Sequence, residues 1–301
     1  MQVVSVIKVR SVINIRKLNI IDENILFELD YDNHKITNTF IGNSRIVTID
    51  NFFKNPSDVV DFAYKTPFSK SEQISAKFPG MRSKVWTDTA ILNNFYQKIL
   101  IDEFKETQYK PNITNINVNA IDSDFQGDFK NLDIKPSFHQ HTDSLAWQRP
   151  FSFRKLFAST VWLNPTEQCS GGTAFWKNKV IDSQSFLSKK AIDKSWERLK
   201  SNPSFENEFI NWETKWISHE YENQTDTHWY ERLLHNYEKS KKIRENEKTW
   251  WTESNSDWEL LDVTEMKYNR MVVYQGIYFH TSYMERDAFI NYPRISFQIF
   301  F

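Results

Sequence analysis

The run Asn115-Ile116-Asn117-Val118-Asn119-Ala120 decides the class of the fold, because apolar and polar residues alternate along it one by one. The alternation belongs to a longer stretch, residues 113–125. Successive side chains of a β-strand point to opposite faces, so a two-residue period puts the apolar residues on one face and the asparagines on the other. The sequence therefore predicts a half-buried strand here.

More strands are predicted on both sides of this run. Short segments rich in β-branched and aromatic residues are typical of strands, and downstream they cover residues 155–163, 173–176, 258–268, 271–279 and 294–301. Upstream, we expect strands at residues 3–7 and 44–49, and helices that begin at Asn55 and at Ala90. Several antiparallel strands with short connections indicate a mainly β sandwich or jelly roll with helical additions.

The composition excludes several classes of function. The chain has 301 residues, 40% of them hydrophobic, which is enough for a full core in one domain with additions. Its 38 Lys and Arg residues nearly balance 39 Asp and Glu residues, so neither nucleic acid nor an anionic membrane is an expected partner. Cys169 is the single cysteine, residues 1–8 lack the basic end and apolar run typical of a signal peptide, and charged residues interrupt every apolar stretch, so we expect no internal disulfide, signal peptide or membrane span. We therefore expect a soluble, cytoplasmic protein.

The predicted organisation has two parts. Residues 1–112 are expected to form N-terminal strands and supporting helices that pack on a core made by residues 113–301. Within that core, residues 181–257 mix charged residues with widely spaced tryptophans, a pattern that favours a helical insertion. Two interpretations of this insertion stay open: a lid or wall of a substrate site, or an interface in a homodimer.

His141 and Asp143 form the first part of a candidate metal site. Residues two apart on a strand point to the same side, so this imidazole and this carboxylate can meet at one cation. The chain has seven histidines and 39 acidic residues, so such a pair also arises by chance. A solvated His and Asp on one strand face is therefore the alternative.

A third ligand is predicted at His280, which follows the apolar run 272–279 and is expected to end a strand. Two histidines and one carboxylate on one face of an octahedron form the triad that binds iron(II) and leaves three positions open. The alternative role for His280 is a strand-end histidine bonded to the backbone.

The last predicted strand carries Arg294 and Ser296, which share a face because they are two residues apart. A guanidinium holds a carboxylate with two parallel hydrogen bonds, and a neighbouring hydroxyl adds a donor. An arginine within an apolar strand is costly to bury without an anionic partner. The pair therefore predicts a pocket for the distal carboxylate of a keto diacid, with a salt bridge to a neighbouring acid as the alternative.

Together and in this order, the motifs resemble those of the iron(II)- and 2-oxoglutarate-dependent dioxygenase superfamily, in particular its prolyl-hydroxylase-like branch. The matching segments are His141-Thr142-Asp143, Gly171-Gly172-Thr173, His280 and Arg294-Ile295-Ser296. The segment Val161-Trp162-Leu163-Asn164 is similar to the strand that precedes Gly-Gly-Thr in that branch. The resemblance covers residues 113–301, and residues 77–83 are faintly similar to a less characterised bacterial and phage family of the superfamily.

The resemblance implies a double-stranded β-helix, or jelly-roll, core and the activity of a hydroxylase. By that likeness His141, Asp143 and His280 bind iron(II), while Arg294 and Ser296 bind the far carboxylate of 2-oxoglutarate. Dioxygen and 2-oxoglutarate are consumed, succinate and carbon dioxide are released, and a C–H bond of an amino acid, a peptidyl residue or another small metabolite is hydroxylated. The carboxylate of Asp143 argues against halogenation, for which the family has a small residue at that position.

Substrate contacts are predicted near the motifs, although each candidate is also explained as a packing or surface residue. The candidates are Arg82, Gln140, Trp147 and Trp176. In a regular strand His139 shares the face of His141, where it either supports the metal ligands or competes with them.

One spacing departs from the family pattern. Asp143 and His280 are 137 residues apart (280 minus 143), whereas five strands with ordinary loops need about 50 to 60 residues. The excess corresponds to the predicted insertion at residues 181–257.

Two other functions remain alternatives. A zinc hydrolase has little support, because the segment His219-Glu220-Tyr221-Glu222-Asn223 lacks a second histidine and the chain has no Cys-x-x-Cys pair. A non-catalytic jelly roll that binds a ligand or a partner is the alternative from another class. Metal content together with succinate production separates it from an oxygenase.

Overall fold

In the described part of the chain, antiparallel strands form most of the regular structure, and the α-helices α2 and α3 pack on one face of the larger sheet. The computed structural model describes residues 26–42, 44–65, 68–70, 81–83, 90–104, 115–121, 157–179, 182, 184, 252–276, 278–284, 288–289 and 291–300. The class of the fold, mainly β with helical additions, is confirmed within these residues.

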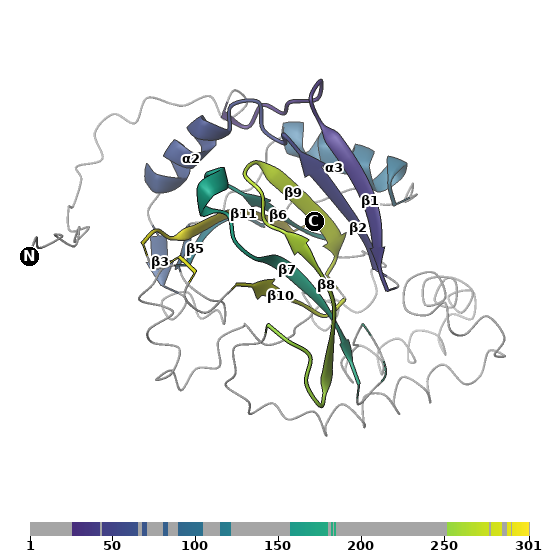
Figure 1. Ribbon diagram of the computed structural model, residues 1–301. Coiled ribbons are helices and arrows are strands. Elements are labelled where there is room, and N and C mark those ends of the chain that lie inside the picture. The colour runs from purple at the N-terminus through teal and green to yellow at the C-terminus, as the bar shows by residue number, and fades with distance from the viewer. Residues whose placement is uncertain are drawn as a thin grey trace, which may run out of the picture.

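Eight strands pair into one large antiparallel sheet in the order β1-β2-β9-β6-β11-β5-β4-β3 (Figure 1). These strands are β1 (Lys35–Ile41), β2 (Ser44–Asp50), β3 (Phe68–Lys70), β4 (Met81–Ser83), β5 (Asn115–Ile121), β6 (Phe157–Trp162), β9 (Arg270–Gln275) and β11 (Arg294–Phe300). A small sheet has the order β10-β7-β8 and consists of β7 (Gly172–Asn178), β8 (Trp258–Glu265) and β10 (His280–Tyr283).

Helices α2 (Pro56–Lys65) and α3 (Ala90–Asp102) pack on one face of the large sheet. Val59 and Ala63 from α2, and Phe95 and Tyr96 from α3, are buried against apolar strand residues in what we call the helix-side core. Tyr96 also hydrogen-bonds to Ser159 of β6 over 2.6 Å. The two helices therefore cover this face of the large sheet with apolar side chains.

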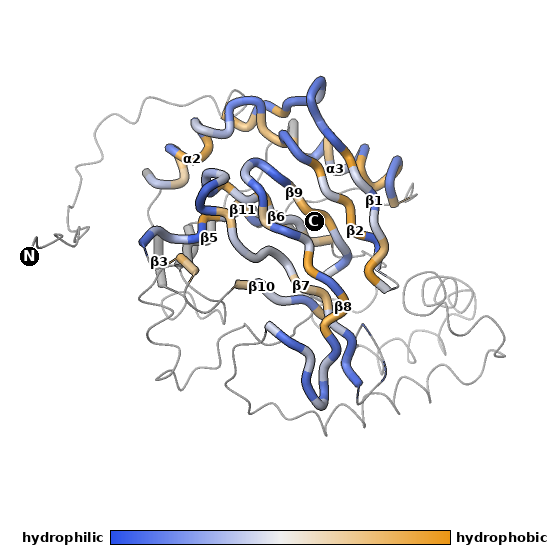
Figure 2. Tube along the Cα trace, viewed as in Figure 1, coloured by the Kyte–Doolittle hydropathy of each residue, from blue (hydrophilic) through white to orange (hydrophobic). Residues whose placement is uncertain are grey.

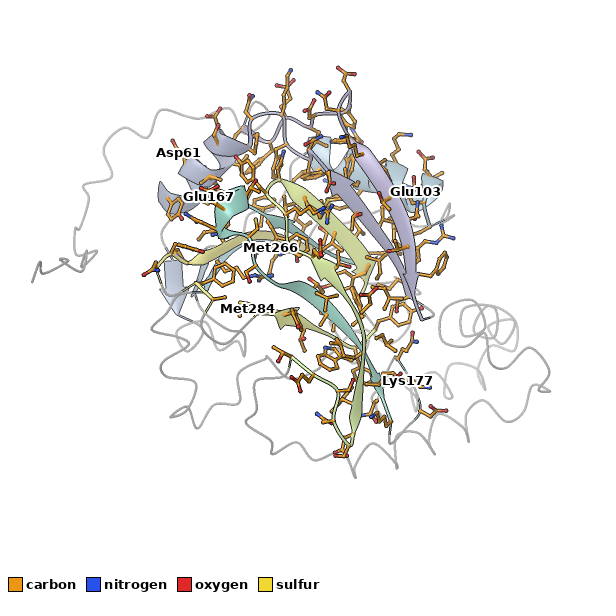
Figure 3. All side chains as sticks on the ribbon, viewed as in Figure 1. Asp61, Glu103, Glu167, Lys177, Met266 and Met284 are labelled. Carbon is orange, nitrogen blue, oxygen red and sulfur yellow. The ribbon has the colours of Figure 1, made fainter. Side chains whose placement is uncertain are left out.

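Alternate residues of the central strands point to opposite faces of the large sheet. On β9, Met271 and Val273 belong to the helix-side core, while Val272 and Tyr274 belong to a second cluster, the inter-sheet core. The inter-sheet core lies between the two sheets, because it joins residues of both: Ile46, Ala158, Trp162, Phe175, Met266, Val272, Tyr274 and Met284. Figure 2 shows apolar residues along the central strands and hydrophilic residues at the turns, and Figure 3 labels Met266 and Met284.

Most strands predicted from the sequence are present. Those expected at 44–49, 113–125, 155–163, 173–176, 258–268 and 294–301 correspond to β2, β5, β6, β7, β8 and β11, with bounds shifted by a few residues. Both predicted helices are confirmed as α2 and α3. The expected strand at 3–7 and most of the expected insertion at 181–257 lie outside the described residues.

The strand predicted over residues 271–279 is present as β9, but the prediction that it continues to His280 is wrong. Strand β9 ends at Gln275, where the amide of Tyr278 donates to the carbonyl of Gln275 over 3.2 Å and closes a turn. His280 then begins β10, which pairs with β7 in the small sheet. Because residues 272–279 are almost all apolar, the sequence does not show that the chain leaves the large sheet after β9 and enters the small sheet at β10.

Neither helix in the described part of the chain combines the length and the apolar character that crossing a membrane requires.

Candidate functional site

Arg294 is the central residue of the candidate site. It begins β11, is only 2% exposed, and reaches from the large sheet to the small one, where its Nη2 donates to the carbonyl of Gly172 over 3.2 Å. Burial lowers the pKa of Arg294 to about 10, so the guanidinium remains charged at neutral pH. The carbonyl of Gly172 is a neutral dipole, so this hydrogen bond does not neutralise the buried positive charge.

The charge of Arg294 has no acidic partner among the described residues. The groups there that influence its pKa by charge are Tyr274 and Cys169, and no described ion pair includes it. Its Nε is fully buried and has no hydrogen-bond partner in the described structure. The salt bridge offered as an alternative role for Arg294 is therefore absent from the described part of the chain.

Gly171 and Gly172 allow β7 to approach closely. Gly171 has φ +73°, a conformation that favours glycine, and a Cβ atom there would overlap the carbonyl of Tyr283. A Cβ atom on Gly172 would overlap the carbonyl of Thr264 in β8. The pair lies at the start of β7, where Gly172 presents its carbonyl to Arg294.

Asn164 positions the start of β11. Its Nδ2 donates to the carbonyl of Pro293 over 2.8 Å, and its Oδ1 accepts from the amide of Ile295 over 2.6 Å. These two bonds fix the backbone on both sides of Arg294, and Asn164 is 1% exposed. The sequence analysis placed Asn164 in a companion strand but did not predict this role. The position of an asparagine directly after an apolar strand was the feature that could have indicated it.

Ser296 and Trp162 are direct partners across β11 and β6, so their side chains lie on the same face of the large sheet. Trp162 belongs to the inter-sheet core, and both the indole Nε1 of Trp162 and the Oγ of Ser296 are buried without a hydrogen-bond partner in the described structure. Gln275 also has unpaired amide atoms, but its register partner Phe157 lies in the helix-side core. Unpaired donors therefore gather beside Arg294 on the inter-sheet face.

His280 lies on the inner face of the small sheet. It is directly opposite Phe175 of the inter-sheet core, its ring centroid is 4.8 Å from that of Tyr274, and it is 4% exposed. Its Nδ1 is 2.8 Å from the carbonyl of Tyr278. Because a carbonyl can only accept, Nδ1 carries the hydrogen and the lone pair of the neutral ring is on Nε2.

The structure therefore brings three of the predicted site residues to the space between the sheets: His280, Arg294 and Ser296. The other predicted metal ligands, His141 and Asp143, lie outside the described residues, as do His139, Gln140 and Trp147. Within the described chain no group of three or more His, Cys, Asp or Glu residues is arranged to hold a metal ion.

Two predicted substrate contacts fall on described strands. Arg82 is the register partner of Asn119, which in turn pairs with Ser296. Trp176 is buried in a separate apolar cluster of the small sheet, together with Trp258 and Phe279, and its Nε1 donates to Thr281 over 3.0 Å. Contact of either residue with a substrate remains a prediction.

Comparison with known proteins identifies the family. No curated protein matches the chain. A family described as of unknown function, DUF6445, matches residues 32–226 and 214–295, so the two matched segments overlap within the stretch predicted as an insertion. Because these matches cover most of the sequence, the chain belongs to DUF6445.

Proposed function

We propose that this protein is a non-haem iron(II)- and 2-oxoglutarate-dependent oxygenase that hydroxylates a C–H bond of an amino acid, a peptidyl residue or another small metabolite. In this proposal His280 binds iron(II) together with His141 and Asp143. Arg294 and Ser296 bind the distal carboxylate of 2-oxoglutarate.

The observation that carries the proposal is the burial of Arg294 without a described counter-charge. Leaving a buried charged group unsatisfied costs more than about 1–3 kcal/mol, so such a group needs an explanation. A ligand carboxylate supplies both the missing charge and acceptors for the unpaired Nε of Arg294 and Oγ of Ser296. The chemistry of these donors therefore fits the proposed co-substrate.

The hydrogen bond of His280 supports its proposed role as a ligand. Metal-binding histidines usually donate their other ring nitrogen to a carbonyl or carboxylate, which fixes the tautomer and the ring orientation. In His280 the bond from Nδ1 to Tyr278 leaves the lone pair on Nε2, the form that a metal requires. A neutral imidazole suits iron(II), and the remaining ligands come from the predicted pair upstream.

The strand connections support a jelly-roll core of the double-stranded β-helix type. From β6 onward the chain passes from the large sheet to the small sheet at β7 and β8, returns at β9, crosses again at β10, and ends in the large sheet at β11. Repeated crossing between two facing antiparallel sheets is the winding of a jelly roll. Binding sites in such folds occupy the interior between the sheets, where His280 and Arg294 lie.

In the proposed reaction dioxygen would be the oxidant, and iron(II) with 2-oxoglutarate would activate it when bound, while the protein supplies binding and orientation. Arg294 and Ser296 fix one end of the keto diacid, and Asn164 fixes the backbone that carries Arg294. The rings of Phe175 and Tyr274 pack in the core beside His280 and limit water there. Positioning of this kind lowers the entropic part of the barrier.

The test is anaerobic reconstitution of the full chain with iron(II), followed by exposure to oxygen with 2-oxoglutarate and measurement of succinate. His280→Ala should abolish succinate formation. The matched control is His34→Ala, because His34 also bonds to a backbone carbonyl, that of Phe52, at the edge of the helix-side core. Equal succinate yields from His280→Ala and wild type would refute the proposal, and binding of 2-oxoglutarate without succinate would favour a non-catalytic binding protein.

A further inference from the structure

The inter-sheet face of the large sheet changes from apolar to polar across its width. Its strand residues in the inter-sheet core come from β1, β2, β6 and β9, namely Ile41, Ile46, Ala158, Trp162, Val272 and Tyr274. On β11, Ile295 and Phe297 face the helix-side core instead. The residues that alternate with them lie on the inter-sheet face and are all polar: Arg294, Ser296 and Gln298. The apolar lining of this face therefore ends at β11, the strand that carries the proposed co-substrate pocket.

Strand β5 continues the polar surface beside β11 (Figure 1). Ser296 is the direct partner of Asn119, and Gln298 is the direct partner of Asn117. Direct partners on neighbouring strands lie on the same face, so both asparagines belong to the inter-sheet face. The polar face that the alternation in β5 predicts is thus the face that also carries Arg294.

Arg82 adds a second cation to this face. On β4 it pairs with Asn119, while its neighbour Met81 pairs with Ala120 on the helix side. Arg82, Asn119 and Ser296 therefore form one row across β4, β5 and β11, which we call the polar row. Neighbouring strands are about 4.8 Å apart, so the Cα atoms of Arg82 and Ser296 are about 10 Å apart. A small molecule bound next to the co-substrate can span this distance.

The polar row separates two positive charges on one face. Arg294 and Ser296 are assigned to the distal carboxylate of 2-oxoglutarate, and Arg82 lies two strands away from Ser296. Asn119 between them is uncharged, and an asparagine amide offers both donors and an acceptor. Two anions bound side by side repel each other, so each needs a cation of its own. Arg82 therefore fits the anionic group of a second molecule.

We propose that Arg82 binds a carboxylate of the substrate, so that the substrate is a small free acid, such as an amino acid, and not a residue inside a peptide. The inference rests on the proposed function and narrows its substrate class. A guanidinium holds a carboxylate with two parallel hydrogen bonds, which fixes its orientation as well as its position. Asn119 pairs with another polar group of the same molecule, and the fixed end presents one C–H bond to the oxidant.

The first test measures succinate formation by the full chain with iron(II), 2-oxoglutarate and oxygen, in the presence of each common L-amino acid as the free acid or as its primary amide. At least one free acid should raise succinate formation above the rate without it. Its amide should have a KM at least about tenfold higher, because the charge that Arg82 binds is missing. Equal stimulation by an acid and its amide, or stimulation by none of the free acids, would overturn the inference.

The same measurement separates this inference from the proposed function. Succinate that forms from 2-oxoglutarate without stimulation by any free acid would leave the oxygenase standing and remove the substrate class. If wild type forms no succinate under any of these conditions, the proposed function fails and the substrate class fails with it.

The second test assigns the charge to Arg82. Arg82→Gln should raise the KM for the stimulating acid at least about tenfold with little change in kcat, and it should no longer distinguish the acid from its amide. Arg82→Lys should recover part of the preference for the acid, because it restores the charge without the planar fork. A purely structural role for Arg82 would not change the preference between acid and amide.

The matched control is Lys70→Gln, which removes one positive charge from the strand next to β4. Lys70 pairs with Met81, so it belongs to the opposite face of the same edge of the sheet. The control should keep the KM of wild type and its preference for the acid. An unchanged KM in Arg82→Gln, or an equal rise in Arg82→Gln and Lys70→Gln, would contradict the assignment.

Discussion

Arg294 is the first residue of β11 in the large sheet, and its guanidinium donates a hydrogen bond over 3.2 Å to the carbonyl of Gly172 on β7 of the small sheet. This bond connects the two sheets through a buried cation that has no described counter-charge. The glycine pair makes it possible, since side chains at Gly171 or Gly172 would overlap neighbouring carbonyls. The most buried charge of the described structure is thus held in place without being neutralised by a described residue.

Arg294→Met should separate binding from stability. Methionine keeps a long side chain but removes a buried charge that lacks a described ion partner. The free energy of unfolding should therefore stay within about 1 kcal/mol of wild type or rise, while the affinity for 2-oxoglutarate should fall at least about 100-fold. Denaturant unfolding and titration calorimetry measure the two effects. A loss of several kcal/mol of stability would mean that the charge is structural.

Trp162→Phe should weaken ligand binding because it removes the unpaired indole donor beside Ser296. Loss of one hydrogen bond to a charged ligand corresponds to about tenfold or more in affinity. Trp258→Phe is the control, because Trp258 is buried in the cluster that contains Trp176 and Phe279 rather than in the inter-sheet core. If both variants bind 2-oxoglutarate like wild type in calorimetry, the indole of Trp162 is not part of the pocket.

Asn164→Leu should destabilise the fold by about 2–5 kcal/mol, because the amide of Ile295 and the carbonyl of Pro293 both lose a buried partner. Asn33→Leu should cost less than about 0.5 kcal/mol, since the bond from Asn33 to Asp30 is exposed. Chemical denaturation compares the two. A similar loss in both variants would remove the positioning role assigned to Asn164.

The ion pair of Asp50 with Arg270 should make stability depend on acid pH. The hydrogen bond from Arg270 is the main cause that lowers the pKa of Asp50 in the folded chain, and burial opposes it. A lowered carboxyl pKa stabilises the folded state above the unfolded value of about 4, and this contribution disappears as the pH falls through the folded pKa. Because Asp50 is 34% exposed, the contribution should be below about 1 kcal/mol.

The measurement is the unfolding free energy of wild type and Asp50→Asn at several pH values. The variant should be less stable than wild type at pH 7, and the difference should vanish when Asp50 of wild type is protonated. A difference that is unchanged at acid pH would show that the loss arises from packing.

The sequence predicted those parts of the fold in which one strand face is polar and the other apolar. On β11, Ile295 and Phe297 point into the helix-side core, whereas Arg294 contacts the small sheet, in agreement with the predicted two-residue period. The strand at β5 could be predicted from the same alternation, because asparagines occupy every second position from Asn115 to Asn119. Where burial differs between two faces, the sequence records the difference directly.

Other features depend on tertiary contacts that a local pattern does not contain. Strand β1 was missed because most of its residues are exposed, so no apolar period marks it. Strand β10 was missed because the run before His280 is apolar on both sides of the turn at Gln275. The unpaired donor of Trp162 is a property of its surroundings, since a tryptophan in an apolar strand is otherwise a packing residue.

Iron binding by His280 and keto-acid binding by Arg294 are tested most directly by a crystal structure of the protein with iron(II) and 2-oxoglutarate under anaerobic conditions, with anomalous diffraction measured at the iron absorption edge. We expect one anomalous peak about 2.0–2.2 Å from Nε2 of His280, with His141 and Asp143 as the other protein ligands and the distal carboxylate of 2-oxoglutarate on Arg294. A peak that lies elsewhere, or a keto acid that does not contact Arg294, would contradict the proposed oxygenase site.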